Sequence, residues 1–443
     1  MLVPALSLLS SIRSAFELYA QRSVLTVFIL GFSSGLPLML VFGVLSFWLR
    51  EAGVSREQIG YFSWVVMAYA IKLFWSPLVD HCALPFLNKL GRRRSWLAAS
   101  QCIIIVAIMA MASTDPQQQL HLMAAYAIAL AIASATQDIA IDAYRIESAP
   151  GKQQAALAAS YLAGYRLAMI FSSAGTLWLA AWFGGHQQNY QLTAWQSTYL
   201  VMAGFMLLAL LNTLLSPEPQ VQSSEVEASV SARTARLQEW LNTAIIGPFL
   251  DFFRRNGWNA LLILSLIASY RITDVVMGVM ANVFYVDMGF SKEEVASVSK
   301  VFGVIMTLVG AAVGGVLINS FGILRILLLG AVLSALTNLL FSYLSTQGHQ
   351  LNLLIGVISM DNLSAGIATS AFIAYLSSLV NLQYTATQYA LFSSLMLLLP
   401  KFLGGFSGGW VEVLDYDRFF MLTALMGLPA ILLCLWLIKK TPQ

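Results

Sequence analysis

Charged residues are scarce in this sequence. Lysine, arginine, aspartate and glutamate together make up 10% of its 443 residues, whereas a soluble protein carries about 25%. Hydrophobic residues make up 58%. This composition excludes an ordinary soluble globular protein and indicates a chain that crosses a membrane several times.

Cysteine and histidine are also few, and their spacing excludes several kinds of site. The three cysteines are scattered and odd in number, which argues against a disulfide framework and a CxxC metal site. The four histidines fall near predicted loops without metal-ligand spacing, and the phosphate-binding motif Gly-x-x-x-x-Gly-Lys-Ser/Thr is absent. We therefore expect no metal, no cofactor, no nucleic-acid partner and no enzymatic activity.

Long apolar runs dominate what remains. A helix that crosses a bilayer needs about 20 mostly apolar residues. Twelve runs meet this rule, near residues 24–49, 59–79, 95–113, 120–143, 154–183, 194–215, 258–285, 295–318, 325–345, 351–378, 386–408 and 419–438. The sequence thus predicts an all-α membrane protein with twelve transmembrane helices.

The basic residues predict the orientation of these helices. With both termini in the cytoplasm, fifteen lysines and arginines fall in cytoplasmic segments and four on the opposite side. This is the bias expected from the positive-inside rule. Residues 1–23 fit a cytoplasmic or interfacial segment better than a secretory signal, and residues 439–443 are a cytoplasmic tail.

Residues 217–257 separate the chain into two halves, 24–216 and 258–438. The stretch from Ser216 to Arg236 is rich in proline, serine, glutamate and alanine, which is typical of a flexible linker. The apolar residues between Leu237 and Phe253 have near-helical spacing. They fit either an amphipathic helix on the membrane surface or a loop packed on the protein.

The two halves share sequence patterns at a nearly constant offset. Gly53–Ile59 returns as Gly289–Val295 after 236 residues, and each stretch follows the first span of its half. A second pattern that leads to Arg166 returns before Lys401, about 234 residues later. We therefore predict two pseudo-symmetric six-helix halves, the plan of major facilitator transporters, with a substrate site between the halves.

The segment between the second and third spans carries a cluster of charge. Asp80 ends the second span, and Gly91, Arg92, Arg93 and Arg94 follow after ten residues. This arrangement resembles the major facilitator signature Gly-x-x-x-Asp-Arg/Lys-x-Gly-Arg-Arg/Lys, with an insertion. An acid and clustered arginines can latch helix ends by charge-assisted hydrogen bonds, although the arginines also serve as a topology signal.

Several stretches in both halves resemble one branch of that superfamily, the AmpG-type muropeptide permeases. These stretches are Lys72–Asp80, Gly91–Trp96, Gln137–Ala143, Asn362–Gly366, Thr369–Phe372 and Ala386–Leu391. The resemblance implies proton-driven import of N-acetylglucosaminyl-anhydromuramic acid, with or without peptide, from the periplasm of a Gram-negative bacterium. It also implies a location in the inner membrane and roles in cell-wall recycling and β-lactamase induction.

Other cargoes stay open. The Gln-Asp-x-x-x-Asp stretch is also similar to acetyl-CoA transporters of the wider group. Shorter relatives that end near a twelfth span, as this sequence does at Gln443, include siderophore importers. A drug exporter would have a more apolar cavity with fewer basic side chains. A membrane sensor that transports nothing would need an appended soluble domain. We expect a monomer whose partners are its small-molecule cargo and the lipid bilayer.

Acidic residues inside spans are candidates for proton coupling, because an acid in the bilayer is costly unless it faces a cavity or a partner. Asp138 and Asp142 are four residues apart and share one helix face, which makes them the favoured pair. Asp274 and Asp361 are the other candidates. A cation that approaches and leaves such a carboxylate would load and release a proton.

Cations, amides and hydroxyls inside spans are candidates for binding the carboxylates and sugars of the cargo. The candidates are Arg166, Lys401, Gln137, Lys72, Arg271, Lys300 and Asn362. Internal pairing with Asp138, Asp142, Asp274 or Asp361 is the alternative for these cations, and Arg271 and Asp274, three residues apart, could pair on one helix face. Lys72 and Lys300 could also snorkel to water from helix ends.

Overall fold

The computed structural model describes residues 21–81, 84, 87–148, 154–184, 189–219, 247–379 and 385–440. Every regular element in these ranges is helical. The chain divides into two compact units. The first comprises residues up to Val54 and Ile71–Gln222, and the second comprises Ser55–Ala70 and the residues from Ser223 onward.

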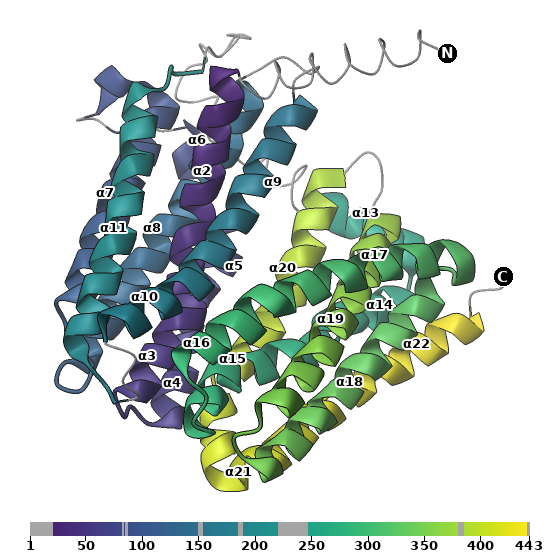
Figure 1. The fold of residues 1–443 in the computed structure, drawn as a ribbon. Coiled ribbons are helices and arrows are strands. Elements are labelled where there is room, and N and C mark those ends of the chain that lie inside the picture. Colours follow the sequence, from purple (N-terminus) through teal and green to yellow (C-terminus); the bar gives the residue numbers. More distant parts are fainter. Residues whose placement is uncertain are drawn as a thin grey trace, which may run out of the picture. The chain divides into compact units, whose positions relative to one another are not determined.

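The first unit is a bundle of long helices, in which α2 packs on α9, and α7 packs on both α8 and α11 (Figure 1). Its elements are α2 (Arg22–Met39), η1 (Leu40–Val44), α3 (Leu45–Glu51), η3 (Lys72–Phe74), α6 (Ser76–His81), η4 (Asn88–Leu90), α7 (Arg92–Ala112), α8 (Leu120–Glu147), α9 (Gln154–Ile170), η6 (Phe171–Gly175), α10 (Thr176–Phe183) and α11 (Leu192–Leu215).

The second unit contains the N-terminal part of the predicted second span together with the C-terminal helices. Its elements are α4 (Arg56–Phe62), η2 (Ser63–Val66), α5 (Met67–Ile71, which ends at the boundary), α13 (Gly247–Asn256), α14 (Asn259–Ser269), α15 (Ile272–Asp287), α16 (Lys292–Glu294), η8 (Val295–Phe302), α17 (Gly303–Phe321), α18 (Ile323–Gln347), α19 (Leu351–Leu379), α20 (Thr385–Gly404), α21 (Ser407–Leu425) and α22 (Leu428–Lys440).

Ten helical runs in the described residues are long and apolar enough to cross a membrane. The second predicted span is not among them, because it is broken into short α and 3₁₀ segments between Arg56 and His81. The last run, Ser407–Lys440, is interrupted at Asp415, whose φ of 60° and ψ of 172° are not helical. The eleventh predicted span is also absent from the ten: it corresponds to α20 (Thr385–Gly404), of which Ser394–Gly404 is a shorter apolar helix.

The repeat predicted from the sequence is confirmed by local geometry. Gly53 and Gly289 have φ values of 81° and 79°, and each ends a helix with the hydrogen bonds of a Schellman motif. Ser55 and Ser291 then cap the next helix, because each side chain accepts a hydrogen bond from the backbone N–H three residues later. The same turn is therefore built twice.

Small residues let helices approach closely in both units. A Cβ added at Gly31 would overlap the Tyr161 carbonyl between α2 and α9, and one at Gly310 would overlap the Leu363 carbonyl between α17 and α19. Helix association in lipid depends on such packing, since there is no hydrophobic drive to bring apolar helices together.

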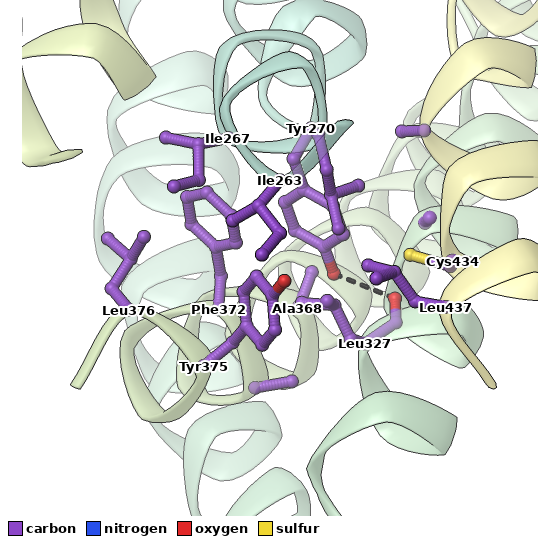
Figure 2. Packing of buried hydrophobic residues seen from close by; sticks show 14 of the residues in the cluster. Ile263, Ile267, Tyr270, Leu327, Ala368, Phe372, Tyr375, Leu376, Cys434 and Leu437 are labelled. Carbon is purple, nitrogen blue, oxygen red and sulfur yellow. Dashed lines mark hydrogen bonds between the residues drawn. The ribbon is translucent and has the colours of Figure 1, made fainter. Parts of the chain in front are cut away.

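Aromatic side chains pack in the hydrophobic core of the second unit (Figure 2). The Tyr270 ring stacks on Phe372 with centroids 4.5 Å apart, and its hydroxyl donates to the Leu327 carbonyl at 2.9 Å. This contact joins α14, α18 and α19, and Cys434 of α22 belongs to the same buried cluster. The polar end of the tyrosine is thus satisfied inside an apolar core.

Candidate functional site

Asp138 stands at the centre of a polar cluster in the first unit. Its Oδ1 accepts a hydrogen bond from the Ser34 hydroxyl at 2.6 Å, and its Oδ2 lies 3.7 Å from Lys72 Nζ. The Tyr161 hydroxyl is 3.1 Å from Ser34 Oγ. Four elements, α2, η3, α8 and α9, therefore meet around one carboxylate whose side chain is only 15% exposed.

Gln137, the residue before Asp138, connects α8 to α2 by a buried hydrogen bond. Its Nε2 donates to the Ser33 carbonyl at 2.9 Å, and its side chain is fully buried. The bond ties α8 to α2 beside Asp138. A position of this kind suits a positioning residue better than the predicted contact with cargo.

Asp142 lies one helical turn further along α8 and is much more accessible. Its side chain is 51% exposed and lies 3.7 Å from Arg145. Arg145 in turn lies over the Tyr161 ring at 5.7 Å. The two predicted acids therefore face different surroundings: Asp138 is enclosed with Lys72, whereas Asp142 opens into a pocket.

That pocket has a volume of about 430 Å³ and is lined in large part by one face of α8. It is lined by Lys72, Arg93, Ile139, Asp142, Ala143, Ile146 and Glu147. Lys72 thus contacts the enclosed carboxylate and also borders the pocket. The pocket therefore borders both the polar cluster around Asp138, through Lys72, and the arginine cluster, through Arg93.

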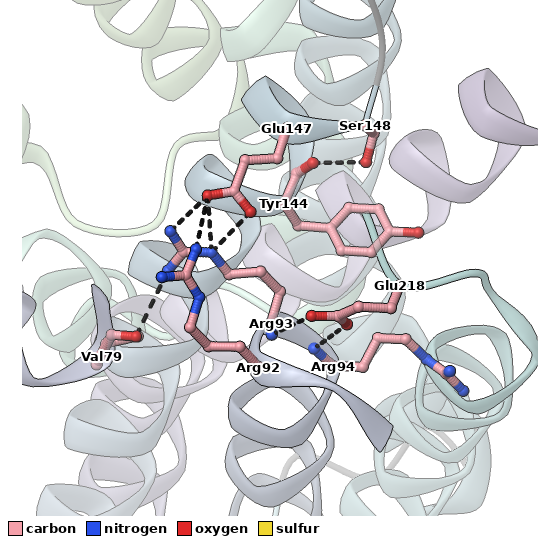
Figure 3. Close-up of polar contacts among 8 residues, drawn as sticks. All are labelled: Val79, Arg92, Arg93, Arg94, Tyr144, Glu147, Ser148 and Glu218. Atoms are coloured by element: carbon pink, nitrogen blue, oxygen red, sulfur yellow. Dashed lines mark hydrogen bonds and ion pairs between the residues drawn. The ribbon is translucent and has the colours of Figure 1, made fainter. Parts of the chain in front are cut away.

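The predicted arginine cluster does join helix ends (Figure 3). Arg93 donates from Nε and Nη2 to the two oxygens of Glu147 at 3.0 and 2.7 Å, and Arg92 adds a bond of 3.2 Å. These bonds hold the start of α7 to the end of α8. The side chain of Asp80, the acid expected here, lies outside the described residues.

A second acid, Glu218, caps the start of α7. Its carboxylate accepts hydrogen bonds from the backbone N–H groups of Arg93 and Arg94 at 2.7 and 3.0 Å, the arrangement favoured at a helix N-terminus. Gly91, with a φ of 92°, leaves room for it, because a Cβ there would overlap the Glu218 side chain. The beginning of the predicted flexible linker is therefore anchored.

The second unit carries its own polar cluster. Arg271 lies between α14 and α15, donates to the Thr369 hydroxyl at 2.8 Å and lies 3.8 Å from Asp274. The expected pairing of these two residues is confirmed. Asp361 accepts a hydrogen bond from Thr337 at 3.1 Å. The helix α19 continues without a break through Asp361, so Asp361 is a polar residue on one face of an intact helix.

The remaining candidates for cargo binding differ in their hydrogen-bond partners and in their exposure. Lys300, in the π-helical segment η8, donates to the amide oxygen of Asn282 at 2.7 Å. Asn362 accepts from Thr307 at 2.9 Å and donates to its own helix. Lys401 lies 3.4 Å from the Val66 carbonyl, and Arg166 is exposed on α9.

The sequence did not single out one further ion pair in the second unit. Arg56 Nε lies 2.7 Å from Asp287, which also accepts a hydrogen bond from the Tyr416 hydroxyl at 2.7 Å. The guanidinium lies 5.1 Å from the centre of the Tyr416 ring. This cluster fixes α4 to the end of α15 and to α21.

Comparison with known proteins places the chain in a family. The model described as Major Facilitator Superfamily matches residues 27–405. The anhydromuropeptide permease of Escherichia coli K12 is 36% identical over 421 residues, which cover 95% of this chain and 80% of that protein. The chain belongs to the AmpG-type branch of the major facilitator superfamily.

Further similarities agree with this membership. A Rickettsia felis protein named AmpG 4 is 32% identical over 424 residues, covering 96% of this chain and 98% of its own length. The D-xylose–proton symporter has a TM-score of 0.67 at 14% identity, with 96% and 98% of the chains covered. The nucleoside transporter NupG has a TM-score of 0.65 at 13% identity, covering 95% of this chain and 100% of its own. These structures confirm the major facilitator fold predicted from the sequence.

Glu147, Glu218 and Ser34 are functional candidates that the sequence analysis missed. Glu147 ends the helix of the fourth span, and Glu218 lies three residues after the helix of the sixth span. In the predicted topology both spans end on the side of the membrane where the third span begins with its arginines. The predicted topology therefore contained a signal for the two acids. Ser34 gave no such signal, since a serine inside an apolar span is common.

Glu147→Gln is expected to lower stability by about 3 kcal/mol, because it removes a carboxylate that accepts two hydrogen bonds from the buried Arg93 guanidinium. The measurement is the thermal unfolding midpoint of the purified transporter. Arg92→Gln is the matched control, since Arg92 bonds the same carboxylate from a more exposed position. Equal midpoints for Glu147→Gln and the wild type would show that the pair does not stabilise these helix ends.

Proposed function

We propose that this permease imports anhydromuropeptides, N-acetylglucosaminyl-anhydromuramic acid with or without peptide, across the bacterial inner membrane. The observation that carries this proposal is the 36% identity to the E. coli anhydromuropeptide permease over 95% of the chain. A carrier of this kind performs no covalent chemistry on its cargo. Alternating access driven by the proton gradient moves the cargo from periplasm to cytoplasm, with both termini cytoplasmic.

Asp138 is the proposed proton carrier. Its carboxylate charge is balanced by Lys72 at 3.7 Å and by the Ser34 hydroxyl. Protonation removes the negative charge, so the attraction to Lys72 is lost and the ammonium becomes free to turn toward the pocket that it borders. Proton loading at Asp138 is thereby linked to the charge that the pocket presents.

Asp142 has a secondary role in this scheme. Its exposed carboxylate and Arg145 form a local pair on the same helix face. Repulsion between two carboxylates one turn apart favours protonation of the enclosed one. Asp274 and Asp361 occupy the polar cluster of the second unit and are proposed as secondary candidates for proton coupling.

Lys300 is the cation that we propose for binding cargo carboxylates. Lys72 and Arg271 are each near an aspartate, which offsets their charge. The described partner of Lys300 is instead the neutral amide of Asn282, so its charge remains to attract an anion. Arg166 and Lys401 are the further cation candidates, and Asn362 offers an amide already bonded to Thr307.

Lys300→Gln is expected to raise the KM for the cargo about tenfold, the loss expected for one hydrogen bond to a charged group, with little change in kcat. Lys300→Arg is the matched variant and should recover part of the affinity, since it keeps the positive charge. Initial uptake rates over a range of cargo concentrations give both constants. A fall in kcat at unchanged KM would contradict a role in binding.

Uptake by cells that lack their own muropeptide permease tests the cargo assignment. The expected result is import of labelled N-acetylglucosaminyl-anhydromuramic acid that excess unlabelled disaccharide suppresses and an excess of a ferric siderophore does not. Absence of import from protein shown to reach the membrane would overturn the assignment. Import of the siderophore and not of the disaccharide would show that the siderophore is the substrate.

A further inference from the structure

A second pocket lies at one end of the first unit and shares no lining residue with the pocket beside Asp142. It has a volume of about 300 Å³ and lies between the start of α2 and the end of α11. It is lined by Arg22, Leu25, Thr26, Asn212, Leu215 and Ser216. The lining combines one guanidinium, two hydroxyls, one amide and two leucines, which is an amphipathic set.

Arg22 supplies the charge of this pocket. The residue is exposed, and its Nη2 donates to the Leu215 carbonyl at 2.5 Å. That described contact uses one donor of a planar fork that has five. The bond fixes the guanidinium at the mouth of the pocket, where its other edge can serve a phosphate oxygen.

The floor of the pocket is polar and buried. Ser216 Oγ lies 2.6 Å from the Asn212 carbonyl and 3.4 Å from Thr26 Oγ1. The Thr26 and Ser216 residues are each 4% exposed. These contacts join α2 to α11. The Ser216 hydroxyl donates its one hydrogen to the Asn212 carbonyl, so the guanidinium of Arg22 is the group that would bind an anion, and the two hydroxyls form a polar wall behind it.

The wall of the pocket continues as an apolar face. Leu215 is 71% exposed and Leu25 is 51% exposed. Leu211 and Leu208, four and seven residues before Leu215 on α11, are 45% and 59% exposed and therefore lie on the same helix face. In a membrane protein such a face meets acyl chains, and here it leads directly to the pocket.

The surrounding charge favours an anionic ligand. Among the side chains described at these bonded helix ends, five are arginines (Arg22, Arg92, Arg93, Arg94 and Arg145) and three are acids (Asp142, Glu147 and Glu218). Glu147 pairs with Arg92 and Arg93, and Asp142 lies near Arg145, whereas the guanidiniums of Arg22 and Arg94 bond the carbonyls of Leu215 and Thr213 at the end of α11. A basic pocket between transmembrane helices is suited to the headgroup of an anionic lipid. A soluble phosphate would make no use of the leucine face.

We propose that this pocket binds the phosphodiester of an anionic phospholipid. Arg22 holds the phosphate, Thr26 and Ser216 lie behind it, and an acyl chain follows Leu215, Leu211 and Leu208 along α11. Bound lipid would fasten the start of α2 to the end of α11. The proposal does not depend on the cargo, because lipid binding is measured without cargo.

Native mass spectrometry of the purified full-length protein, titrated with phosphatidylglycerol or phosphatidylcholine, tests this proposal. The wild type is expected to retain one phosphatidylglycerol molecule in preference to phosphatidylcholine. Arg22→Gln should weaken the phosphatidylglycerol adduct about fivefold, the contribution of one basic residue near an anionic surface. Arg22→Lys keeps the charge and should retain most of the binding.

Arg325→Gln is the matched control, because Arg325 is an exposed arginine near the start of another helix, α18. It should leave the adduct unchanged. If Arg22→Gln proves too unstable to purify, Leu215→Gln keeps the arginine and should weaken the adduct through the acyl-chain path. Equal phosphatidylglycerol affinity in the wild type and Arg22→Gln, or equal loss in Arg325→Gln, would overturn the proposal.

Discussion

Asp138→Asn is expected to abolish gradient-driven accumulation of the disaccharide while leaving exchange of cargo across the membrane intact. Asparagine keeps the shape and accepts the Ser34 hydrogen bond, but it cannot carry a proton. One proton moving through 100 mV supplies about 2.3 kcal/mol, or about fiftyfold accumulation. The variant should therefore equilibrate its cargo without concentrating it, as measured by uptake and counterflow in membrane vesicles.

Asp142→Asn is the matched control on the same helix face. Its carboxylate is half exposed and paired with Arg145, so we expect a much smaller loss of accumulation. Full accumulation in both variants would remove this pair from the mechanism. Loss of exchange in Asp138→Asn would indicate that the residue supports folding or binding and not proton coupling.

Gly310→Leu is expected to prevent stable folding. A Cβ at this position would overlap the backbone carbonyl of Leu363, so α17 and α19 would have to separate along their interface. Overpacking a core costs about 1–3 kcal/mol when side chains can yield, and a backbone carbonyl yields less readily. We expect little monodisperse protein after extraction, measured by fluorescence-detected size-exclusion chromatography.

Gly315→Leu separates this effect from a general intolerance of leucine in α17. Apart from the neighbouring backbone of α17 itself, no described atom lies within 4 Å of a Cβ built at Gly315, so the added side chain would project into open space. Yield and elution profile should match those of the wild type. Comparable yields for Gly310→Leu and Gly315→Leu would refute the close approach of α17 and α19.

Hydropathy and the internal repeat were sufficient to predict the fold. The repeat was detectable because Gly53 and Gly289 need a positive φ and Ser55 and Ser291 cap helices, and these requirements restrict residue type. The breaks in the second span could not be predicted in this way. An apolar run has the same mean hydropathy whether its backbone is α-helical or passes through 3₁₀ turns.

The candidate site was predictable in part. Asp138 was identifiable because an acid in an apolar run is costly. Pairing of Lys72 with Asp138 was one of several alternatives that the sequence left open. The choice among them could not be made, because 66 residues separate the two and the packing of η3 against α8 brings them together. The same holds for Arg56 and Asp287, which are 231 residues apart. Local pairs such as Arg271 with Asp274 were predicted from spacing alone.

The most direct test of proton-coupled muropeptide import is transport by the purified protein in liposomes. Labelled N-acetylglucosaminyl-anhydromuramic acid would be supplied outside, with an imposed inward proton gradient, while internal pH is recorded. We predict accumulation well above equilibrium, acidification that depends on the disaccharide, and loss of both effects with a protonophore. Equal accumulation with and without the gradient, or no disaccharide-dependent proton movement, would contradict the account.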